Sequence, residues 1–430
     1  IMKKLITLLT FIPCFCFGQW TQLGANINGS QASDRLGNTN SIAIDSIGNT
    51  MAVGSAFNSN VFPYSGYAEV LDWDGVSWVQ RGNDFVGTDS TLEGTGSAVD
   101  LSADGLTVAV SSPWGYNSLG YKCGNVRVFD WSNGSWIQRG AVIEGEGNIS
   151  PSLSSDVFGF ALELSSDGNY IVVGAKGNYN TVSGKVGHVR IYHWDGLAWQ
   201  QIGQDIDGPN SNQNGTEFGD AVSINRAGNR VAIGGRGYKS SQALSEQGIA
   251  YVLEWNGSAW AMMGDTLFGA ASGDRLGSAV QLSSDGNSMA VSAPGANGSL
   301  GSTRVFDWDG VDWVLRGAAI TGVSSSSIAK SGTSLGFSFD GNRLAIGEPQ
   351  ANFSAGTTRV FKWDGSSWQQ FGATLSDGTS TQGFGSAVRL NASGTRVIIG
   401  TPLNDDAGLD AGKVQVYENS ALVSVSELNS

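Results

Sequence analysis

The amino-acid sequence predicts an all-β protein, a seven-bladed β-propeller built from four-stranded blades. Three observations predict this fold class. One sequence pattern recurs seven times along the 430 residues, a tryptophan pair recurs in six of these copies, and the strand missing from the last copy occurs at the N-terminus. Self-similarity at a fixed period of this length is typical of repeat architectures in which each copy is one supersecondary unit.

The first half of the repeat contains a conspicuous glycine and a tight turn. The third copy opens as F-G-F-A-L-E-L-S-S-D-G-N-Y-I-V-V-G-A from Phe158. The opening glycine recurs at spacings of 53 to 63 residues, at Gly37, Gly96, Gly159, Gly219, Gly277, Gly332 and Gly385. Short runs rich in β-branched residues flank the Ser-x-Asp-Gly turn, so this half predicts a β-hairpin.

The second half of the repeat contains two tryptophans five residues apart. The pairs are Trp73/Trp78, Trp131/Trp136, Trp194/Trp199, Trp255/Trp260, Trp308/Trp313 and Trp363/Trp368. A glycine between the two supplies the positive φ of a tight hairpin. We expect the two indoles to face each other across this hairpin and to pack the blades together rather than to contact a ligand.

Each copy therefore predicts four short strands. In the second copy they span Ser97–Leu101, Leu106–Ser111, Asn125–Trp131 and Ser135–Arg139. No helical periodicity of useful length occurs along the chain. The tight turns join strands one to two and three to four, so we expect the longer, variable connections to emerge together on the opposite face. Variable loops on a rigid scaffold are where binding is expected.

The ends of the chain predict how the ring closes. The seventh copy has its third strand, Lys413 to Tyr417, but no tryptophan pair after it. Residues Trp20 to Gly24 match Trp368 to Gly372. We expect the N-terminal strand to complete the last blade, with Tyr417 and Trp20 in the two tryptophan places, which removes an exposed sheet edge.

Residues 1–18 are predicted to be a secretory signal peptide. Lys3 and Lys4 precede an apolar run from Leu5 to Phe17, with small residues before Gln19. Residues 19–420 are then the propeller, and 421–430 form a tail. We expect an exported protein, secreted or on the cell surface.

Composition and charge exclude some partners. Removing the leader takes away two lysines and no acid, which leaves a net charge of −16. Recognition of nucleic acid needs a basic footprint, so nucleic acid is not expected as a partner. No later segment has 18 consecutive apolar residues, so no membrane span is predicted. We expect a monomer that binds a glycan or a surface protein.

The repeat resembles a known family. The pattern F-G-x-A-V, then S-x-D-G-N-x-x-A-V-G-A-P, then G-x-V-R-V-F is similar to the FG-GAP repeats of integrin α-type propellers, over nearly the whole mature chain. The Trp-Asp-Gly-x-x-Trp element is closer to a group of secreted repeat proteins of flavobacteria and marine microbes. The resemblance implies the propeller fold and a binding or adhesive role. It does not bring the family's calcium loops, because those hairpins need D-x-D-x-D-G and read S-S-D-G-N or N-A-S-G-T here.

The tail also resembles a known type of segment. Ala421 to Ser430 is similar to the lead-in to the C-terminal sorting domain of type IX secretion substrates, and an ordinary tail is the alternative.

Candidate ligand-binding residues are those that break the repeat in the long loops. Aromatic side chains there stack on sugars or anchor protein interfaces, or else pack on their own loops. Basic residues in the loops of blades two to four form either a patch for an anionic ligand or a random scatter. The aromatic candidates are Trp114, Tyr116, Tyr121, Tyr179 and Tyr238, with Tyr64 in a comparable loop, and the basic candidates are Lys176, Arg236 and Lys239, with Lys122 and Lys185 nearby.

Evidence for metal binding and catalysis is sparse. Asp405, Asp406 and Asp410 are either ligands for calcium or a solvated turn, and no other cofactor is expected. The two histidines, His188 and His193, lie in and beside one repeat strand without partners for a metal triad or a nucleophilic set. We therefore expect a protein that is not an enzyme.

The function predicted from the sequence is recognition of carbohydrate or protein through the long-loop face. One alternative is a structural module of a larger secreted protein. The other is a hydrolase that acts on a polysaccharide with two loop carboxylates.

Overall fold

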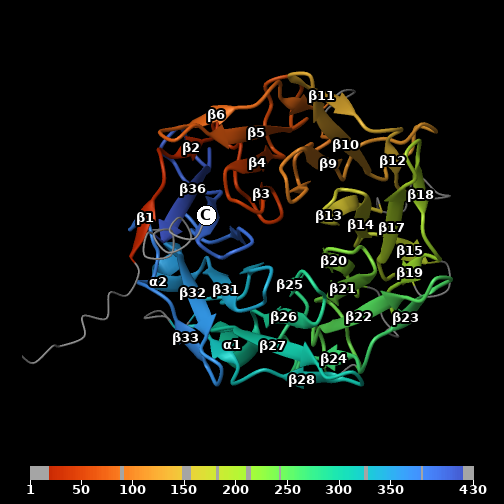
Figure 1. The fold of residues 1–430 in the computed structure, drawn as a ribbon, viewed down its shortest axis with the longest axis vertical. Helices are drawn as coiled ribbons and strands as arrows, with labels where there is room; N and C mark the ends of the chain where they lie inside the picture. Colours follow the sequence, from red (N-terminus) through yellow and green to blue (C-terminus); the bar gives the residue numbers. More distant parts are fainter. Residues whose placement is uncertain are drawn as a thin grey trace, which may run out of the picture.

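The computed structural model describes residues 19–87, 92–147, 156–180, 184–209, 215–241, 244–323, 328–378 and 381–419. Seven antiparallel sheets are arranged in a ring around a central axis (Figure 1). The protein is thus an all-β, seven-bladed propeller, as the sequence predicts. Within the described ranges, no helix has the length and apolar character needed to cross a membrane.

Each blade runs from an inner strand at the axis to an outer edge at the rim (Figure 1). Blade 1 contains β3 (Ile42–Ile44), β4 (Thr50–Ser55), β5 (Tyr67–Trp73), β6 (Trp78–Gln80) and β7 (Phe85–Val86). Blade 2 contains β8 (Val99–Leu101), β9 (Thr107–Ser112), β10 (Asn125–Ser132), β11 (Ser135–Gln138) and β12 (Ile143–Glu144). Blade 3 contains β13 (Phe158–Leu164), β14 (Tyr170–Ala175), β17 (His188–Trp194), β18 (Trp199–Gln201) and β19 (Ile206–Asp207), and β15 (Tyr179–Asn180) and β16 (Gly184–Lys185) pair in its long loop.

The remaining blades follow the same order. Blade 4 contains β20 (Phe218–Ile224), β21 (Arg230–Gly235), β22 (Ile249–Trp255), β23 (Trp260–Met262) and β24 (Leu267–Phe268). Blade 5 contains β25 (Val280–Leu282), β26 (Ser288–Ala293), β27 (Ser302–Trp308), β28 (Trp313–Leu315) and β29 (Ile320–Thr321), with the short turn α1 (Ala296–Ser299). Blade 6 contains β30 (Ser334–Phe337), β31 (Arg343–Glu348), β32 (Thr357–Trp363) and β33 (Trp368–Gln370), with the short turn α2 (Ala351–Ser354). Blade 7 contains β34 (Ala387–Leu390), β35 (Arg396–Thr401) and β36 (Lys413–Asn419), completed by β1 (Trp20–Gln22) and β2 (Ile27–Asn28) from the N-terminal side.

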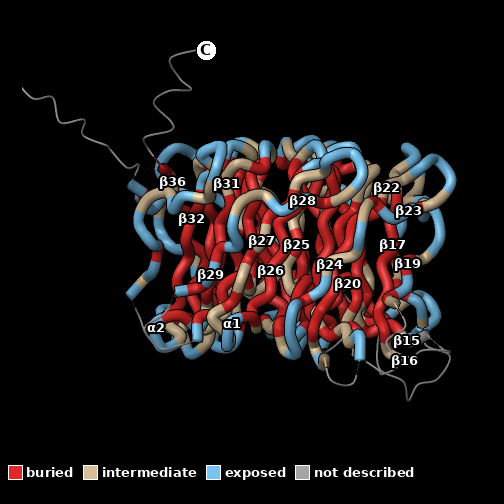
Figure 2. Tube along the Cα trace, turned by 90° about the horizontal axis from the view of Figure 1, so that it is seen from below, coloured by how far each residue is buried: buried red, intermediate tan, exposed pale blue. Residues whose placement is uncertain are grey.

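The core lies between the blades rather than in one central mass. All six residues of β9 are buried, because both faces of this strand pack against neighbouring blades. Side chains there are small or β-branched, which suits a strand covered on both faces. Figure 2 shows buried residues through the middle of the ring's height and exposed residues at its two ends.

The outer edge of a blade differs from the single fourth strand that the sequence predicts. In blade 2, both β11 and β12 pair with β10, so the edge is broken into two short segments. Gly140 lies at this break with φ of +74°, and a Cβ atom there would lie 2.6 Å from the ring of Trp194 in blade 3. The edge therefore breaks where the next blade's tryptophan needs a residue without a side chain.

The tryptophan pairs link each blade to the preceding one. Trp131 faces Trp136 directly in the register of β10 and β11, as predicted, and their ring centroids are 5.1 Å apart. The second indole of every pair donates its Nε1–H to a backbone carbonyl of the preceding blade. These bonds run from Trp78 to Leu23, Trp136 to Arg81, Trp199 to Arg139, Trp260 to Ile202, Trp313 to Met263 and Trp368 to Arg316.

Ring closure follows the prediction with one correction. β1 pairs with β36, and the indole of Trp20 donates to the carbonyl of Phe371 in blade 6, which repeats the bond of the other blades (Figure 1). The partner of Trp20 in the register is Asn419 rather than Tyr417, which lies opposite Gln22. β36 ends two residues later than the predicted third strand, so Asn419 occupies the position that the first tryptophan of the pair has in the other blades.

An arginine reaches the hairpin of the next blade at six of the seven junctions in the described structure. In blades 1, 2 and 5 it follows the outer strand, and its guanidinium donates to a hairpin carbonyl: Arg81 to Gly105, Arg139 to Gly168 and Arg316 to Gly341. In blades 4, 6 and 7 it begins the second strand instead: Arg230 to Gly286, Arg343 to Ser393 and Arg396 to Gly48. Blade 3 has Tyr170 and Ile202 at these two places.

Backbone hydrogen bonds also link the first hairpins of neighbouring blades. They run from Ser46 to Ala103, Ala103 to Ser166, Arg226 to Ser284, Ser284 to Phe339, Phe339 to Ala392 and Ala392 to Ser46. In the described residues, the step from Ser166 to Arg226, between blades 3 and 4, is the missing one. The hairpin face is therefore a nearly continuous hydrogen-bonded ring.

Candidate functional site

The long connections of all blades lie at one end of the ring, opposite the tight hairpins. α1, α2, β15 and β16 mark this end, which is the lower one in Figure 2. We call it the loop face. This arrangement is the one that the turn lengths in the sequence predict.

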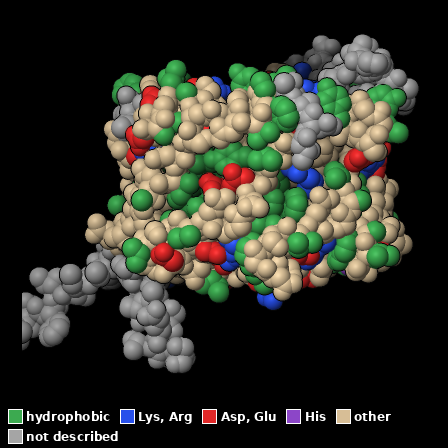
Figure 3. Space-filling view, turned by 90° about the horizontal axis from the view of Figure 1, so that it is seen from above, with side chains coloured by type: hydrophobic (Ala, Val, Ile, Leu, Met, Phe, Trp, Pro, Cys, Tyr) green, Lys and Arg blue, Asp and Glu red, His purple; other side chains and the backbone are tan. Residues whose placement is uncertain are grey.

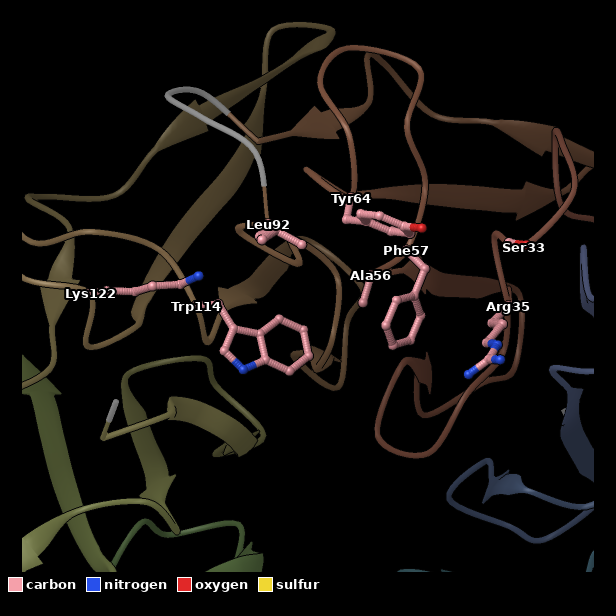
Figure 4. Close-up of a pocket in the computed structure, with 8 residues that line it drawn as sticks. All are labelled: Ser33, Arg35, Ala56, Phe57, Tyr64, Leu92, Trp114 and Lys122. Carbon is pink, nitrogen blue, oxygen red and sulfur yellow. The ribbon is translucent and has the colours of Figure 1, made fainter. Parts of the chain in front are cut away.

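A pocket of about 540 Å³ opens on the loop face between blades 1 and 2 (Figure 4). Three aromatic side chains and two aliphatic ones line it, with a cation at each end. The lining residues are Ser33, Arg35, Ala56, Phe57, Tyr64, Leu92, Trp114 and Lys122. We call it the Trp114 pocket.

Trp114 forms one wall of the pocket and is half-buried. It follows β9, and its backbone N–H donates to the carbonyl of Glu93. The edge of its indole lies against Gly94, where a Cβ atom would collide with the ring. The ring of Phe57 lies across the pocket with its centroid 6.3 Å away, and the centroid of the Tyr64 ring lies 6.5 Å from that of Phe57, with the two planes nearly perpendicular. The three rings therefore leave aromatic surface open to a ligand.

The two cations at the ends of the pocket differ in their contacts. The guanidinium of Arg35 lies 5.3 Å from the ring of Phe57 and 3.5 Å from the carboxylate of Asp410. Both members of this ion pair are substantially exposed, so the pair is weak. Lys122 has no ion pair with any described residue. In Figure 4, Lys122 lies beyond Trp114 and Arg35 lies beyond Phe57, at opposite ends.

Of the other aromatic candidates, Tyr64 also lines the Trp114 pocket, and the remaining four do not. Tyr116 and Tyr121 are exposed on the loop of Trp114, and Tyr121 lies against Gly147. Tyr179 is half-buried in β15. Tyr238 packs on the blade 4 core, with its ring 5.6 Å from that of Phe268.

The basic candidates are largely neutralised by acids. Lys176 donates to Asp220 at 2.9 Å and lies over the ring of Phe160. Burial lowers the pKa of Lys176, although Asp220 opposes this effect. Arg236 pairs with Glu217 at 2.7 Å and with Asp220 at 3.2 Å. The sequence could not show that these acids lie beside the two cations. Because they do, little free positive charge remains at Lys176 and Arg236.

Lys239 is half-buried, next to Tyr238, and has no ion pair with a described residue. A second, smaller pocket of about 270 Å³ lies at the loop-face mouth of the central axis. Arg236, Arg275 and Lys330 line it with Asp220. Arg275 pairs with Glu246 at 2.6 Å, so this mouth too is charged but mostly balanced.

The acidic candidates do not converge on one point. Asp406 accepts from Lys413 at 3.1 Å, Asp410 pairs with Arg35, and the carboxylate of Asp405 accepts from the backbone N–H of Asp410 at 2.8 Å. Among the described residues, the group of three or more His, Cys, Asp or Glu side chains with ligand atoms within 4.8 Å of one another is Glu146, His188 and Asp205. The expectation that the histidines have no partners for a metal triad is therefore wrong for His188.

The one cysteine among the described residues is a core residue. Cys123 is fully buried, and its thiol donates to the carbonyl of Gly145 at 3.3 Å. Burial raises the pKa of its thiol to about 12, which makes it a poor nucleophile.

The outer wall between blades 1 and 2 carries a further hollow, of about 260 Å³. Figure 3 shows hydrophobic side chains gathered in a hollow of this wall beside acidic and basic ones. Phe85, Phe129 and Trp136 line it with Asp84 and Arg127. Burial, followed by the charge of Asp84, raises the pKa of nearby Glu69 to about 7.

Sequence reasoning missed several residues of the Trp114 pocket. Arg35 occupies the position two residues before the opening glycine, where every blade has a positive φ angle. The residues there are Arg35, Gly94, Val157, Glu217, Arg275, Lys330 and Gly383. Phe57 and Leu92 carry no signal in the sequence, because their approach to Trp114 depends on the packing of blade 1 against blade 2.

A comparison with protein families agrees with the repeat found in the sequence. Residues 368–417, which contain β33 and most of blade 7, match the FG-GAP repeat family. No curated protein matches the chain. A solved structure described as the Dos1 propeller has a TM-score of 0.49 and 11% sequence identity, over 93% of this chain and 95% of that chain. The FG-GAP resemblance found in the sequence is confirmed for residues 368–417, and an FG-GAP repeat in a propeller suggests a binding or structural module.

Proposed function

We propose that this FG-GAP-repeat propeller is an exported or cell-surface binding protein that recognises an acidic carbohydrate through the Trp114 pocket. We further propose that it retains the carbohydrate unchanged. The observation that carries the proposal is the pocket itself: three aromatic rings on two adjacent blades, with a cation at each end.

The aromatic surface favours a sugar ring. The hydrophobic face of a pyranose stacks on an indole or phenol ring, and such contacts need an aromatic side chain that is held in place but not fully covered. Trp114 meets both conditions, because Gly94 and Phe57 support it and it stays half-buried. Tyr64 is 45% exposed, so its hydroxyl is also available to a ligand.

The charges favour an acidic sugar over a neutral one. Arg35 and Lys122 lie at opposite ends of the pocket, and one weak ion pair with Asp410 is all that offsets them among the described residues. On a protein with a net charge of −14, two such cations beside exposed aromatic rings form a local site for a carboxylate. A guanidinium binds a carboxylate through two parallel hydrogen bonds, which adds orientation to affinity.

Calorimetric titration of the purified protein with a uronic-acid oligosaccharide and with its neutral methyl ester tests the proposal. Trp114→Ala should weaken binding of both forms by about tenfold or more, which corresponds to about 1.4 kcal/mol of lost stacking. Lys122→Gln should weaken binding of the acid form and leave the ester unaffected. Tyr121→Ala is the matched control, because this exposed tyrosine lies on the same loop outside the pocket.

Three results would contradict the proposal. Release of reducing ends would make the protein a hydrolase. Equal binding by wild type and by both pocket variants would place the ligand elsewhere. Absence of binding to any glycan tried would favour a protein partner or a purely structural module.

A further inference from the structure

A partly buried cluster of ionisable side chains lies where blade 2 meets blade 3. Glu146 follows β12 of blade 2, His188 begins β17 of blade 3, and Asp205 precedes β19. One ligand atom from each of these three side chains lies within 4.8 Å of the others. The cluster does not belong to the Trp114 pocket, and none of these residues lines that pocket.

Two polar atoms in and beside the cluster are buried without a hydrogen-bond partner from the protein. They are Nε2 of His188 and Oδ2 of Asp156, and each residue is only 1% exposed. Asn178 joins Asp156 to the cluster, because its amide lies 3.5 Å from both Asp156 and Glu146. Most buried polar side-chain atoms in proteins are hydrogen-bonded, so two buried atoms without a partner at one place indicate that a ligand binds there.

The charges in the cluster do not balance. Among the described residues, Arg190 is the one cation that contacts it, donating to Asp205 at 2.7 and 2.9 Å and also to Glu146. Against it stand three carboxyl groups, those of Glu146, Asp156 and Asp205. With all three ionised, the cluster carries an excess of two negative charges, which a divalent cation would neutralise.

The side chains of the cluster are of the types that bind a metal. His188 offers an imidazole nitrogen, and Glu146 and Asp205 each offer a carboxylate oxygen. A metal ion takes such groups as neutral imidazole and ionised carboxylates.

We propose that Glu146, His188 and Asp205 bind a divalent transition-metal ion of the zinc type at the junction of blades 2 and 3. A nitrogen ligand together with carboxylate oxygens suits zinc, cobalt or nickel better than calcium, which takes oxygen ligands in larger number. Glu146 belongs to the edge of blade 2 and the other two ligands to blade 3, so the ion would fasten one blade to the next. Arg190 keeps its contact with the carboxylates and orients them, as partners of metal ligands commonly do.

Titration of the full chain with Zn²⁺ alone tests this site, followed by calorimetry and by the melting temperature. Co²⁺ in place of Zn²⁺ adds a visible absorption band that reports the ligands. We expect one ion per chain and a melting temperature that rises with metal concentration. His188→Gln and Glu146→Gln should each weaken binding by tenfold or more.

The chain supplies its own control. His193→Gln removes the other of its two histidines, which stacks on Tyr170 and lies outside the cluster, and should leave binding unchanged. Glu146→Gln keeps the test decisive if His188→Gln does not fold, because the side chain of Glu146 is 50% exposed. No binding by the folded wild type would overturn the proposal and leave ordered water as the partner of the two orphaned atoms. Unchanged binding by the Glu146 and His188 variants would also overturn it, as would calcium binding that is as tight as zinc binding.

Discussion

Replacement of Trp313 measures what the repeated tryptophan bond contributes to the ring. The side chain is 6% exposed, and its indole donates to the carbonyl of Met263 in the preceding blade at 2.7 Å. Trp313→Ala removes both the packing and the hydrogen bond. Trp313→Phe keeps most of the apolar surface and loses only the hydrogen bond.

The two effects can be estimated separately. A buried indole covers about 200 Å² of surface, worth roughly 5 kcal/mol at about 25 cal/mol per Å², and measured Trp→Ala losses are about 3–5 kcal/mol. An unpaired buried carbonyl costs about 1–2 kcal/mol. The unfolding entropy is about 2.1 cal/mol/K per residue, or roughly 0.8 kcal/mol/K for this ring. The alanine variant should therefore melt about 4–6 °C below wild type, and the phenylalanine variant about 1–2 °C below it.

Differential scanning calorimetry provides the assay. Val311→Ala is the matched control, because this residue is exposed in the same hairpin and should melt with the wild type. If Trp313→Ala melts within about 1 °C of wild type, the tryptophan does not pack the blades together as proposed. Equal losses in the alanine and phenylalanine variants would show that the hydrogen bond, rather than the buried surface, dominates.

Two further predictions concern the glycines beside the tryptophan pairs and Asp100 of the inner strand β8. Gly203→Ala should lower the melting temperature more than Gly196→Ala. Both glycines have positive φ angles, so both substitutions strain the backbone. A Cβ atom at Gly203 would lie 2.8 and 2.9 Å from the paired indoles of blade 4, whereas a Cβ atom at Gly196 would meet open space. Equal losses would mean that backbone strain alone is responsible. Burial, reinforced by the charge of Glu163, raises the pKa of Asp100 from 3.8 to about 7, so the native protein holds more protons than the unfolded chain between these values. The free energy of unfolding should therefore fall as the pH rises from about 4 toward 7, and urea titrations of Asp100→Asn should show a shallower slope; an unchanged slope would contradict this assignment.

The sequence predicts the fold well because the same physical need recurs in every blade. Each blade requires a tight hairpin, a glycine under the next blade's indole and an indole that bonds backward, so these residues repeat and the period is visible. The broken outer edge is visible only in the structure. The sequence predicts that the outer strand ends before Gly140. It does not indicate that Ile143 and Glu144 pair with β10 again after this glycine.

The candidate site is predicted less completely, because it is made between repeats. Trp114 could be found as an aromatic residue that departs from the pattern. Phe57 reaches it from the equivalent loop of blade 1, and Arg35 from the connection before that blade. Glu146 and His188 are 42 positions apart in sequence and belong to different blades, so their proximity depends on how two blades pack. Spacing along the chain carries no information about such contacts.

The arginines show why a repeat can conserve a contact without conserving a position. A guanidinium placed after the outer strand and one placed at the start of the second strand both reach the next blade's hairpin, as Arg139 and Arg230 do. Where one position holds arginine the other does not, because a second guanidinium would face the first. Blade 3 has neither, and the backbone bond between the hairpins of blades 3 and 4 is missing among the described residues as well. On the loop face of that same junction, Lys176 of blade 3 and Arg236 of blade 4 both bind Asp220 of blade 4. Lys176 thus makes, on the opposite face, a contact between blades 3 and 4 of the kind that arginine makes at the other junctions, which explains why its charge is paired within the protein.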